Sequence, residues 1–205
     1  PQNPKTPTKE QILFIFYYMS TLSKLALLGA VSAQAGLPDG FSFAISLDSE
    51  TGMLKYDVTI PENTYLGLVY GKGMTNVDMV VFSASGFGSV TDHWSKFYGA
   101  PPEDAQNDYM NTQVDISEGS YTFTTYRDLV TSDPNGEDYQ FETFDPLEMQ
   151  WVVNENTADM KKHTKDGEFT LTISQDGSSA VIQEDSSAYL AASAFTVATW
   201  AALMM

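Results

Sequence analysis

Short segments separated by turn signals fill the middle of this 205-residue chain, and they limit its fold more than any other feature. Residues 41–47 and 53–60 alternate apolar and polar side chains, and residues 48–52 form a turn between them. A period of two is typical of a β-strand with one buried face. Strands this short, recurring about every ten residues, predict an all-β, antiparallel β-sandwich.

The same kind of segment recurs to residue 183. The expected strands are residues 41–47, 53–60, 65–70, 78–83, 89–94, 113–116, 121–127, 147–153, 168–173 and 180–183. Segments 65–70 and 78–83 are continuous apolar runs, and Gly71 and Gly73 stand between them. We expect one domain over residues 36–187, which is long enough to enclose a sizeable core.

The N-terminal region has the order of a secretory signal peptide. Met19 is a possible start, Lys24 is basic, an apolar run follows, and Ser32–Ala35 ends in an Ala-x-Ala pattern. We expect a signal peptide over 19–35 and an upstream extension over 1–18. The alternative is one membrane helix over about residues 12–31, but a charge at mid-bilayer costs about 3 kcal/mol.

The C-terminal residues 188–205 form an apolar tail without charge, which we expect to be helical. Small residues ahead of an apolar terminus are typical of a GPI-attachment signal. A tail anchor in the membrane and a helix packed on the domain are the alternatives. The expected location is therefore secreted or cell-surface.

Charge and the lack of cysteine exclude several functions. Residues 36–187 hold 26 of the 27 acidic side chains and seven of the ten basic ones, a net charge of −19. This disfavours nucleic acid and anionic membranes as partners. With no cysteine, covalent c-type haem, thiolate metal sites and cysteine nucleophiles are excluded. No hydrolytic constellation is evident, so a redox or binding module is expected rather than an enzyme.

Five blocks of sequence, in order, resemble the DOMON domain, a secreted β-sandwich of immunoglobulin-like architecture. They are 43–60, the block from Tyr65 through Met74 to Val81, 89–95, the block Tyr121–Asp133 around Arg127, and the late pair Trp151 and His163. The resemblance covers about residues 40–175. It implies the sandwich fold found in cytochrome domains of cellobiose dehydrogenases.

In haem-binding members of that family, the methionine of the second block and the late histidine are the iron ligands. The resemblance therefore implies that Met74 and His163 bind the iron of b-type haem. A soft thioether opposite an imidazole raises the reduction potential relative to two histidines. His93 is a weaker alternative ligand.

Further residues are expected around such a haem. Gly73 would let the backbone approach a flat ring. The aromatic side chains of Tyr70, Phe82 and Trp151 are expected to wall the pocket. Arg127, the only arginine, is expected to pair with Asp78 or Asp133, or alternatively to contact a haem propionate.

The acidic segment 133–138 offers alternating oxygens, as a calcium loop does, but the full EF-hand pattern is absent. A solvated acidic turn is the expectation there.

Two main functions remain open. One is electron transfer by b-type haem with a redox partner protein. The other is a haem-free adhesion module that binds extracellular carbohydrate through exposed aromatic side chains. A structural surface-coat domain is a third and weaker alternative.

Overall fold

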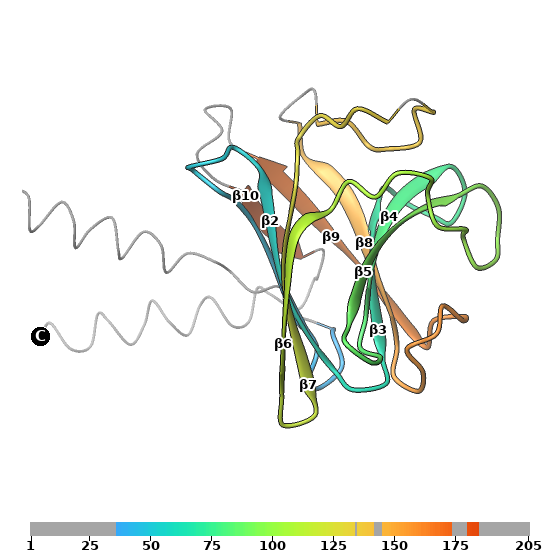
Figure 1. The fold of residues 1–205 in the computed structure, drawn as a ribbon. Helices are drawn as coiled ribbons and strands as arrows, with labels where there is room; N and C mark the ends of the chain where they lie inside the picture. Colours follow the sequence, from blue (N-terminus) through green and yellow to red (C-terminus); the bar gives the residue numbers. More distant parts are fainter. Residues whose placement is uncertain (1–35, 134, 142–144, 174–179, 185–205) are drawn as a thin grey trace, which may run out of the picture. The chain divides into compact units, whose positions relative to one another are not determined.

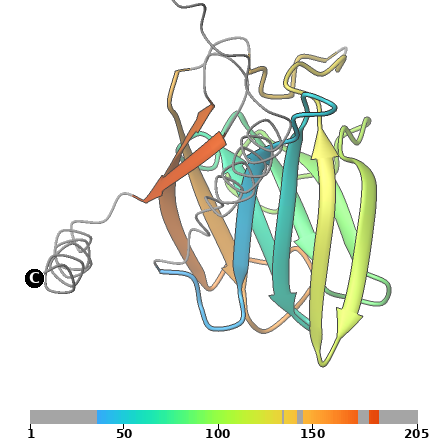
Figure 2. The same cartoon turned by 90° about the vertical axis from the view of Figure 1, so that its left-hand side faces the viewer.

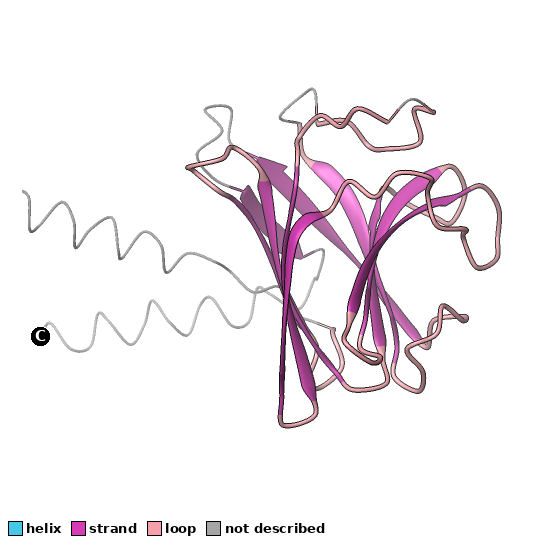
Figure 3. Cartoon of the chain, viewed as in Figure 1, coloured by secondary structure: helices cyan, strands magenta, loops and turns pink. Residues whose placement is uncertain are grey.

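The computed structural model describes residues 36–133, 135–141, 145–173 and 180–184. In these ranges the protein contains strands and loops and no helix (Figure 3). The ten strands are β1 (Ser42–Leu47), β2 (Leu54–Pro61), β3 (Tyr65–Tyr70), β4 (Val77–Ser83), β5 (Ser89–Ser95), β6 (Met110–Ser117), β7 (Ser120–Arg127), β8 (Leu147–Asn154), β9 (Lys165–Ile173) and β10 (Ala180–Glu184). Every strand expected from the sequence is present.

The strands form two antiparallel sheets that face each other as a sandwich (Figures 1 and 2). The four-stranded sheet has the order β1-β2-β7-β6, and Figure 2 shows it face on. The six-stranded sheet has the order β10-β9-β8-β3-β4-β5. The predicted all-β, antiparallel sandwich is confirmed.

The main core lies between the sheets. Strand β2 alternates buried and half-buried residues along its length, as expected for a strand with one face on a core. The largest core side chains include Tyr56, Phe82, Phe123 and Phe169, all nearly inaccessible to solvent.

Strand β3 differs because every one of its residues is buried. Its inward side chains join the main core, whereas Tyr65 and Val69 belong to a second apolar cluster on the opposite face of the six-stranded sheet. The apolar runs 65–70 and 78–83 are therefore covered on both faces, which explains why they do not alternate.

The expected extension, signal peptide and C-terminal tail lie outside the described residues. Within the described residues, nothing is helical over a length that could cross a bilayer.

Candidate functional site

A cavity of about 500 Å³ lies on the outer face of the six-stranded sheet. Its walls come from the sheet and from three loops: the loop between β3 and β4, the loop after β5, and the loop between β8 and β9 (Figure 1). The lining residues are Tyr65, Met74, Met79, Tyr98, Gly99, Ala100, Pro101, Val152, Met160, Lys161, Lys162 and His163.

The floor of the cavity is apolar because of strand alternation. Met79 on β4 and Val152 on β8 are outward residues of central strands, and both belong to the second apolar cluster. Gly67 lies between them on β3, where a Cβ would come within 2.8 Å of Val152 Cγ2 and 3.0 Å of Met79 Cε. The missing side chain lets these two neighbours close over the sheet.

The first wall is the turn that carries Met74. Gly71 and Gly73 have φ angles of +129° and +93°, which only glycine adopts readily. The Gly73 N–H donates to Gln150 Oε1 at 3.1 Å, and the Ser95 hydroxyl donates to the Met74 carbonyl at 2.6 Å. Both neighbouring strands therefore hold the turn, and the Met74 side chain is half-buried.

The second wall is the loop 155–164, which carries His163. The Tyr65 hydroxyl donates to the carbonyl of Lys161. Asn154 Nδ2 donates to the carbonyl of Lys162 at 2.8 Å, and the Ser83 hydroxyl donates to the carbonyl of Ala158 at 3.0 Å. Burial raises the pKa of Tyr65 to about 12, so its hydroxyl remains a donor at neutral pH.

The His163 side chain is 22% exposed, and its Nε2 lies 3.5 Å from Asp166 Oδ1. Two lysines, Lys161 and Lys162, precede it at the same cavity. The cavity thus has His163 and two lysine residues at one side and an apolar floor.

The third wall is the loop after β5, residues 98–101, and the ring of His93 is hydrogen-bonded to its backbone. His93 Nδ1 lies 3.2 Å from the Pro101 carbonyl, which can only accept, so this nitrogen carries the proton. The Nε2 atom, 2.8 Å from the Thr91 hydroxyl, then acts as the acceptor. Burial lowers the pKa of His93 despite the opposing charges of Glu103 and Asp104, so the ring is neutral.

The structure brings Met74 and His163, the two residues singled out as ligands, to the same cavity. Gly73 directly precedes Met74 in its turn. His93, the weaker alternative, is among the buried residues of β5 and uses both ring nitrogens for local hydrogen bonds.

The structure corrects the expectation that three aromatic side chains wall the pocket. Tyr70, Phe82 and Trp151 belong to the core between the sheets, not to the cavity lining. Successive residues of a strand point to opposite faces, and all three share the inward parity of their strands. The aromatic residues at the cavity are Tyr65 and Tyr98 instead.

Arg127 is fully buried between the sheets. Its NH2 group lies 3.0 Å from Asp78 Oδ2 and 2.9 Å from the Tyr139 carbonyl. The guanidinium carbon lies 5.2 Å from the ring centroid of Tyr70 and 5.9 Å from that of Tyr109, within range of cation–π attraction. The expected ion pair with Asp78 is therefore confirmed, with Asp78 rather than Asp133 as the partner.

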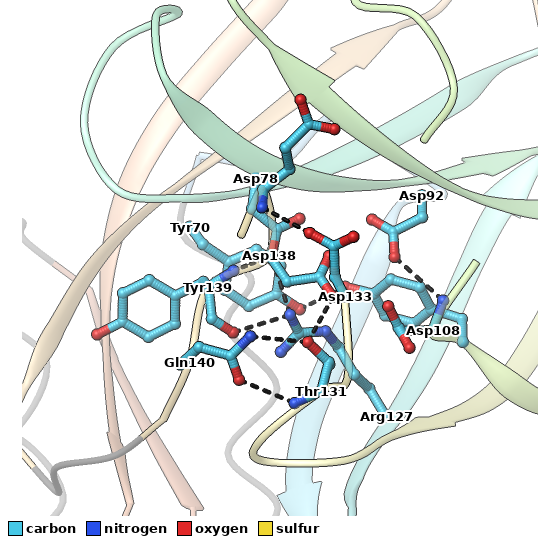
Figure 4. Close-up of polar contacts among 12 residues, drawn as sticks. Tyr70, Asp78, Asp92, Asp108, Arg127, Thr131, Asp133, Asp138, Tyr139 and Gln140 are labelled. Atoms are coloured by element: carbon cyan, nitrogen blue, oxygen red, sulfur yellow. Dashed lines mark hydrogen bonds and ion pairs between the residues drawn. The ribbon is translucent and has the colours of Figure 1, made fainter. Parts of the chain in front are cut away.

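The acidic segment 133–138 departs from the expected solvated turn. Asp133 does cap an exposed turn by accepting from Asn135 N at 3.1 Å and Glu137 N at 2.6 Å. Asp138, however, is only 7% exposed and turns toward the Arg127 region (Figure 4). The local sequence resembles an exposed turn because the residues that cover Asp138 are distant in the chain.

Sequence reasoning missed Met79, Met160 and the two lysines as cavity residues. The continuous apolar run 65–70 could have indicated a covered outer face, because a strand that is buried on both faces needs loops or other elements over the side away from the core. Which loops cover it depends on the strand order, and the sequence does not supply that order.

The fold and the cavity can be compared with known proteins. A family model of the DOMON domain matches residues 39–154, more than half of the chain. The chain belongs to the DOMON domain family. No curated protein matches its sequence at a significant level.

Among solved structures, this DOMON domain resembles the cytochrome domain of Myriococcum thermophilum cellobiose dehydrogenase. The TM-score is 0.52 at 12% sequence identity, over 72% of this chain and 83% of that one. It also matches the cytochrome b domain of pyranose dehydrogenase from Coprinopsis cinerea, with a TM-score of 0.45 at 11% identity, over 64% and 76% of the two chains. At such identities the likeness shows the fold alone.

Proposed function

We propose that this DOMON domain binds b-type haem in the cavity on the six-stranded sheet and serves electron transfer. The observation that carries the proposal is that Met74 and His163 line one apolar cavity from two different loops. A thioether and an imidazole are a known axial pair for haem iron.

The other lining residues fit the same group. Met79 and Val152 supply an apolar floor, and Gly67 keeps that floor low. Lys162 also lines the cavity and brings a positive charge that suits the carboxylates of a haem, whereas the ammonium group of Lys161 lies 3.4 Å from Asp159 Oδ2. A cavity of about 500 Å³ lies in the range of cofactor sites.

Each residue then has a defined task. Met74 and His163 would hold the iron, and the bound haem would supply a reversible one-electron couple. Tyr65 and Asn154 fix the backbone beside His163, and Ser95 fixes the backbone of Met74. His163 Nε2 lies 3.5 Å from Asp166 Oδ1, so either this nitrogen would turn away from Asp166 to bind the iron or the Nδ1 atom would serve as the ligand.

The partner is a redox protein. Tyr98 is 82% exposed at the cavity and its neighbour Phe97 is 63% exposed, which leaves an aromatic surface at the mouth. The strongly acidic surface favours a partner with positive charge. We further propose that the domain works outside the cell, where the expected signal peptide would direct it.

A haem titration tests the proposal. The full chain is mixed with haem and followed by absorption, and we expect a Soret band, with sharp visible bands on reduction. His163→Gln is expected to abolish this spectrum, and Met74→Leu is expected to change the ligation and lower the reduction potential.

Matched controls come from the same cavity and from the other histidine. Met79→Leu and Met160→Leu alter the other two methionines of the lining, and His93→Gln alters the only other histidine. All three are expected to retain the wild-type spectrum. Failure of the wild type to take up haem, or an unchanged spectrum in both ligand variants, would contradict the proposal.

A second candidate is the binding of carbohydrate at the same mouth without haem. The exposed rings of Phe97 and Tyr98 favour it, because sugars stack on such faces. Binding of glycans that is lost in Tyr98→Ala but retained in Met74→Leu and His163→Gln would support this candidate over the first.

A further inference from the structure

Four aspartates, Asp78, Asp92, Asp108 and Asp138, lie close together near Arg127 (Figure 4). Asp78 and Asp92 alternate with Met79 and His93 along β4 and β5, so they point to the opposite face from the cavity floor. Asp78 lies on β4 and Asp92 on β5, and each is only 2% exposed. Asp108 precedes β6, and Asp138 lies in the segment after β7. These carboxylates come from four separate parts of the chain.

These four carboxylates have too few hydrogen-bond and ion-pair partners to compensate their negative charge. Asp78 Oδ2 is satisfied by Arg127 and by the Tyr139 N–H at 2.8 Å. Asp92 Oδ2 accepts from the Asp108 N–H at 3.2 Å, and Asp138 Oδ2 accepts from the Thr131 hydroxyl at 2.5 Å. Arg127 is the single cation among the hydrogen-bond and ion-pair partners of these four carboxylates.

Several oxygens remain buried without a donor. Within the described part of the chain, no hydrogen-bond partner reaches Asp78 Oδ1, Asp92 Oδ1 or Asp108 Oδ2. An unsatisfied buried carboxylate oxygen is costly, and such atoms in native proteins point to a missing proton, water or ion.

The geometry fits one ion. One carboxylate oxygen from each of Asp78, Asp92 and Asp138 lies within 4.8 Å of the other two. Oxygens bound to one calcium at about 2.3–2.6 Å can be separated by at most about 5 Å. The three oxygens are therefore close enough to share one calcium ion.

The chemistry of the donors favours a hard divalent cation, of which calcium accepts the widest range of oxygen geometries. The three groups are carboxylates with no nitrogen or sulfur among them, which suits a hard cation and not zinc or copper. Asp104 and Asp133, both half-buried, form a second close trio with Asp138. They extend the acidic lining from the buried site toward the surface.

We propose that Asp78, Asp92 and Asp138 form a calcium-binding site that ties β4 and β5 to the segment after β7. The site is separate from the proposed haem ligands and does not depend on haem. Bound calcium would neutralise the excess negative charge beside Arg127 and brace the two strands whose other face bears Met79 and His93.

Calorimetric titration of the full chain with calcium chloride, after treatment with EDTA and at pH 8, tests the site. We expect binding of about one ion per chain, and a higher melting temperature with calcium than with EDTA. Asp92→Asn and Asp138→Asn are each expected to weaken binding by at least about tenfold, because the charge of the ligand set controls calcium affinity.

The control is Asp115→Asn, which changes an exposed aspartate on β6 and should bind as the wild type does. The melting temperatures in EDTA show that the variants fold, since removing a buried charge should raise or preserve stability without calcium. Absence of binding by the wild type, or equal binding by the wild type and both cluster variants, would overturn the proposal and indicate shared protons instead.

Discussion

The two faces of β4 and β5 are chemically opposite although their residues alternate along the same strands. The inward face carries the buried Asp78 and Asp92, of which Asp78 pairs with Arg127, and the outward face presents Met79 and His93 to the cavity and its loops. Both faces are buried, so both are costly to disturb. The difference is that charge must be compensated on one face, whereas shape and apolar contact dominate on the other.

This contrast teaches how one sheet can support two sites. Cross-strand pairing sets Met79 opposite His93 and Val80 opposite Asp92, so the register that builds the cavity floor also builds the aspartate cluster. A shift of one residue in this register would exchange the two faces.

The sharpest test of the inward face is Arg127→Met. Removing the cation leaves Asp78 buried without its charge partner, and we expect a loss of about 3–5 kcal/mol in the free energy of unfolding. Chemical denaturation measures this value. Lys96→Met is the control: Lys96 is 57% exposed in its pair with Glu137, so it should cost less than about 1 kcal/mol. Equal losses would remove the distinction between buried and surface charge.

Substitutions at two glycines compare how tightly the core side and the cavity side of the sheet are packed, without a change of charge. A Cβ at Gly167 would overlap the indole ring of Trp151, its cross-strand partner in the core. A Cβ at Gly67 meets a methyl group of Val152 and the flexible end of Met79 beside the cavity. We expect Gly167→Ala to cost about 3 kcal/mol and Gly67→Ala about 1 kcal/mol, because only the cavity side leaves room to adjust.

Denaturation of both variants checks this order, and haem uptake by Gly67→Ala checks whether the floor has risen. The reverse order of stabilities would show that the cavity side is packed as tightly as the core.

The smallest expected effect is the pH dependence contributed by His93. Burial lowers its folded pKa below 6.5, so the unfolded chain binds the proton more readily. Its contribution to stability is complete above pH 6.5 and is lost as the pH falls below that value, with a slope of at most about 1.4 kcal/mol per pH unit. Between pH 7 and 5, the wild type should therefore lose more stability than His93→Gln. Parallel curves for the two proteins would show that His93 does not titrate in this range.

The strands were predictable because their signals are local. Alternation over residues 53–60 and the turn before them identify β2 without knowledge of any neighbour. The pair of Arg127 with Asp78 was also accessible, since a lone arginine among so many acids requires a partner if it is buried.

The predicted pocket walls were wrong for the opposite reason. Tyr70, Phe82 and Trp151 lie in strands or strand ends buried on both faces, and an apolar run carries no mark of which face is the core. The expectation of a solvated turn was wrong at Asp138 for a similar reason, because the residues around it lie on β4, on β5 and in the loop before β6.

The sequence by itself determined the strand positions, the sandwich class and the residue types available as ligands, because period, turn chemistry and composition are properties of neighbouring residues. Only the tertiary structure decided which side of the six-stranded sheet became the cavity and which the charged cluster. Strand order and register assign each side chain to a face, and both arise from contacts between segments far apart in the chain.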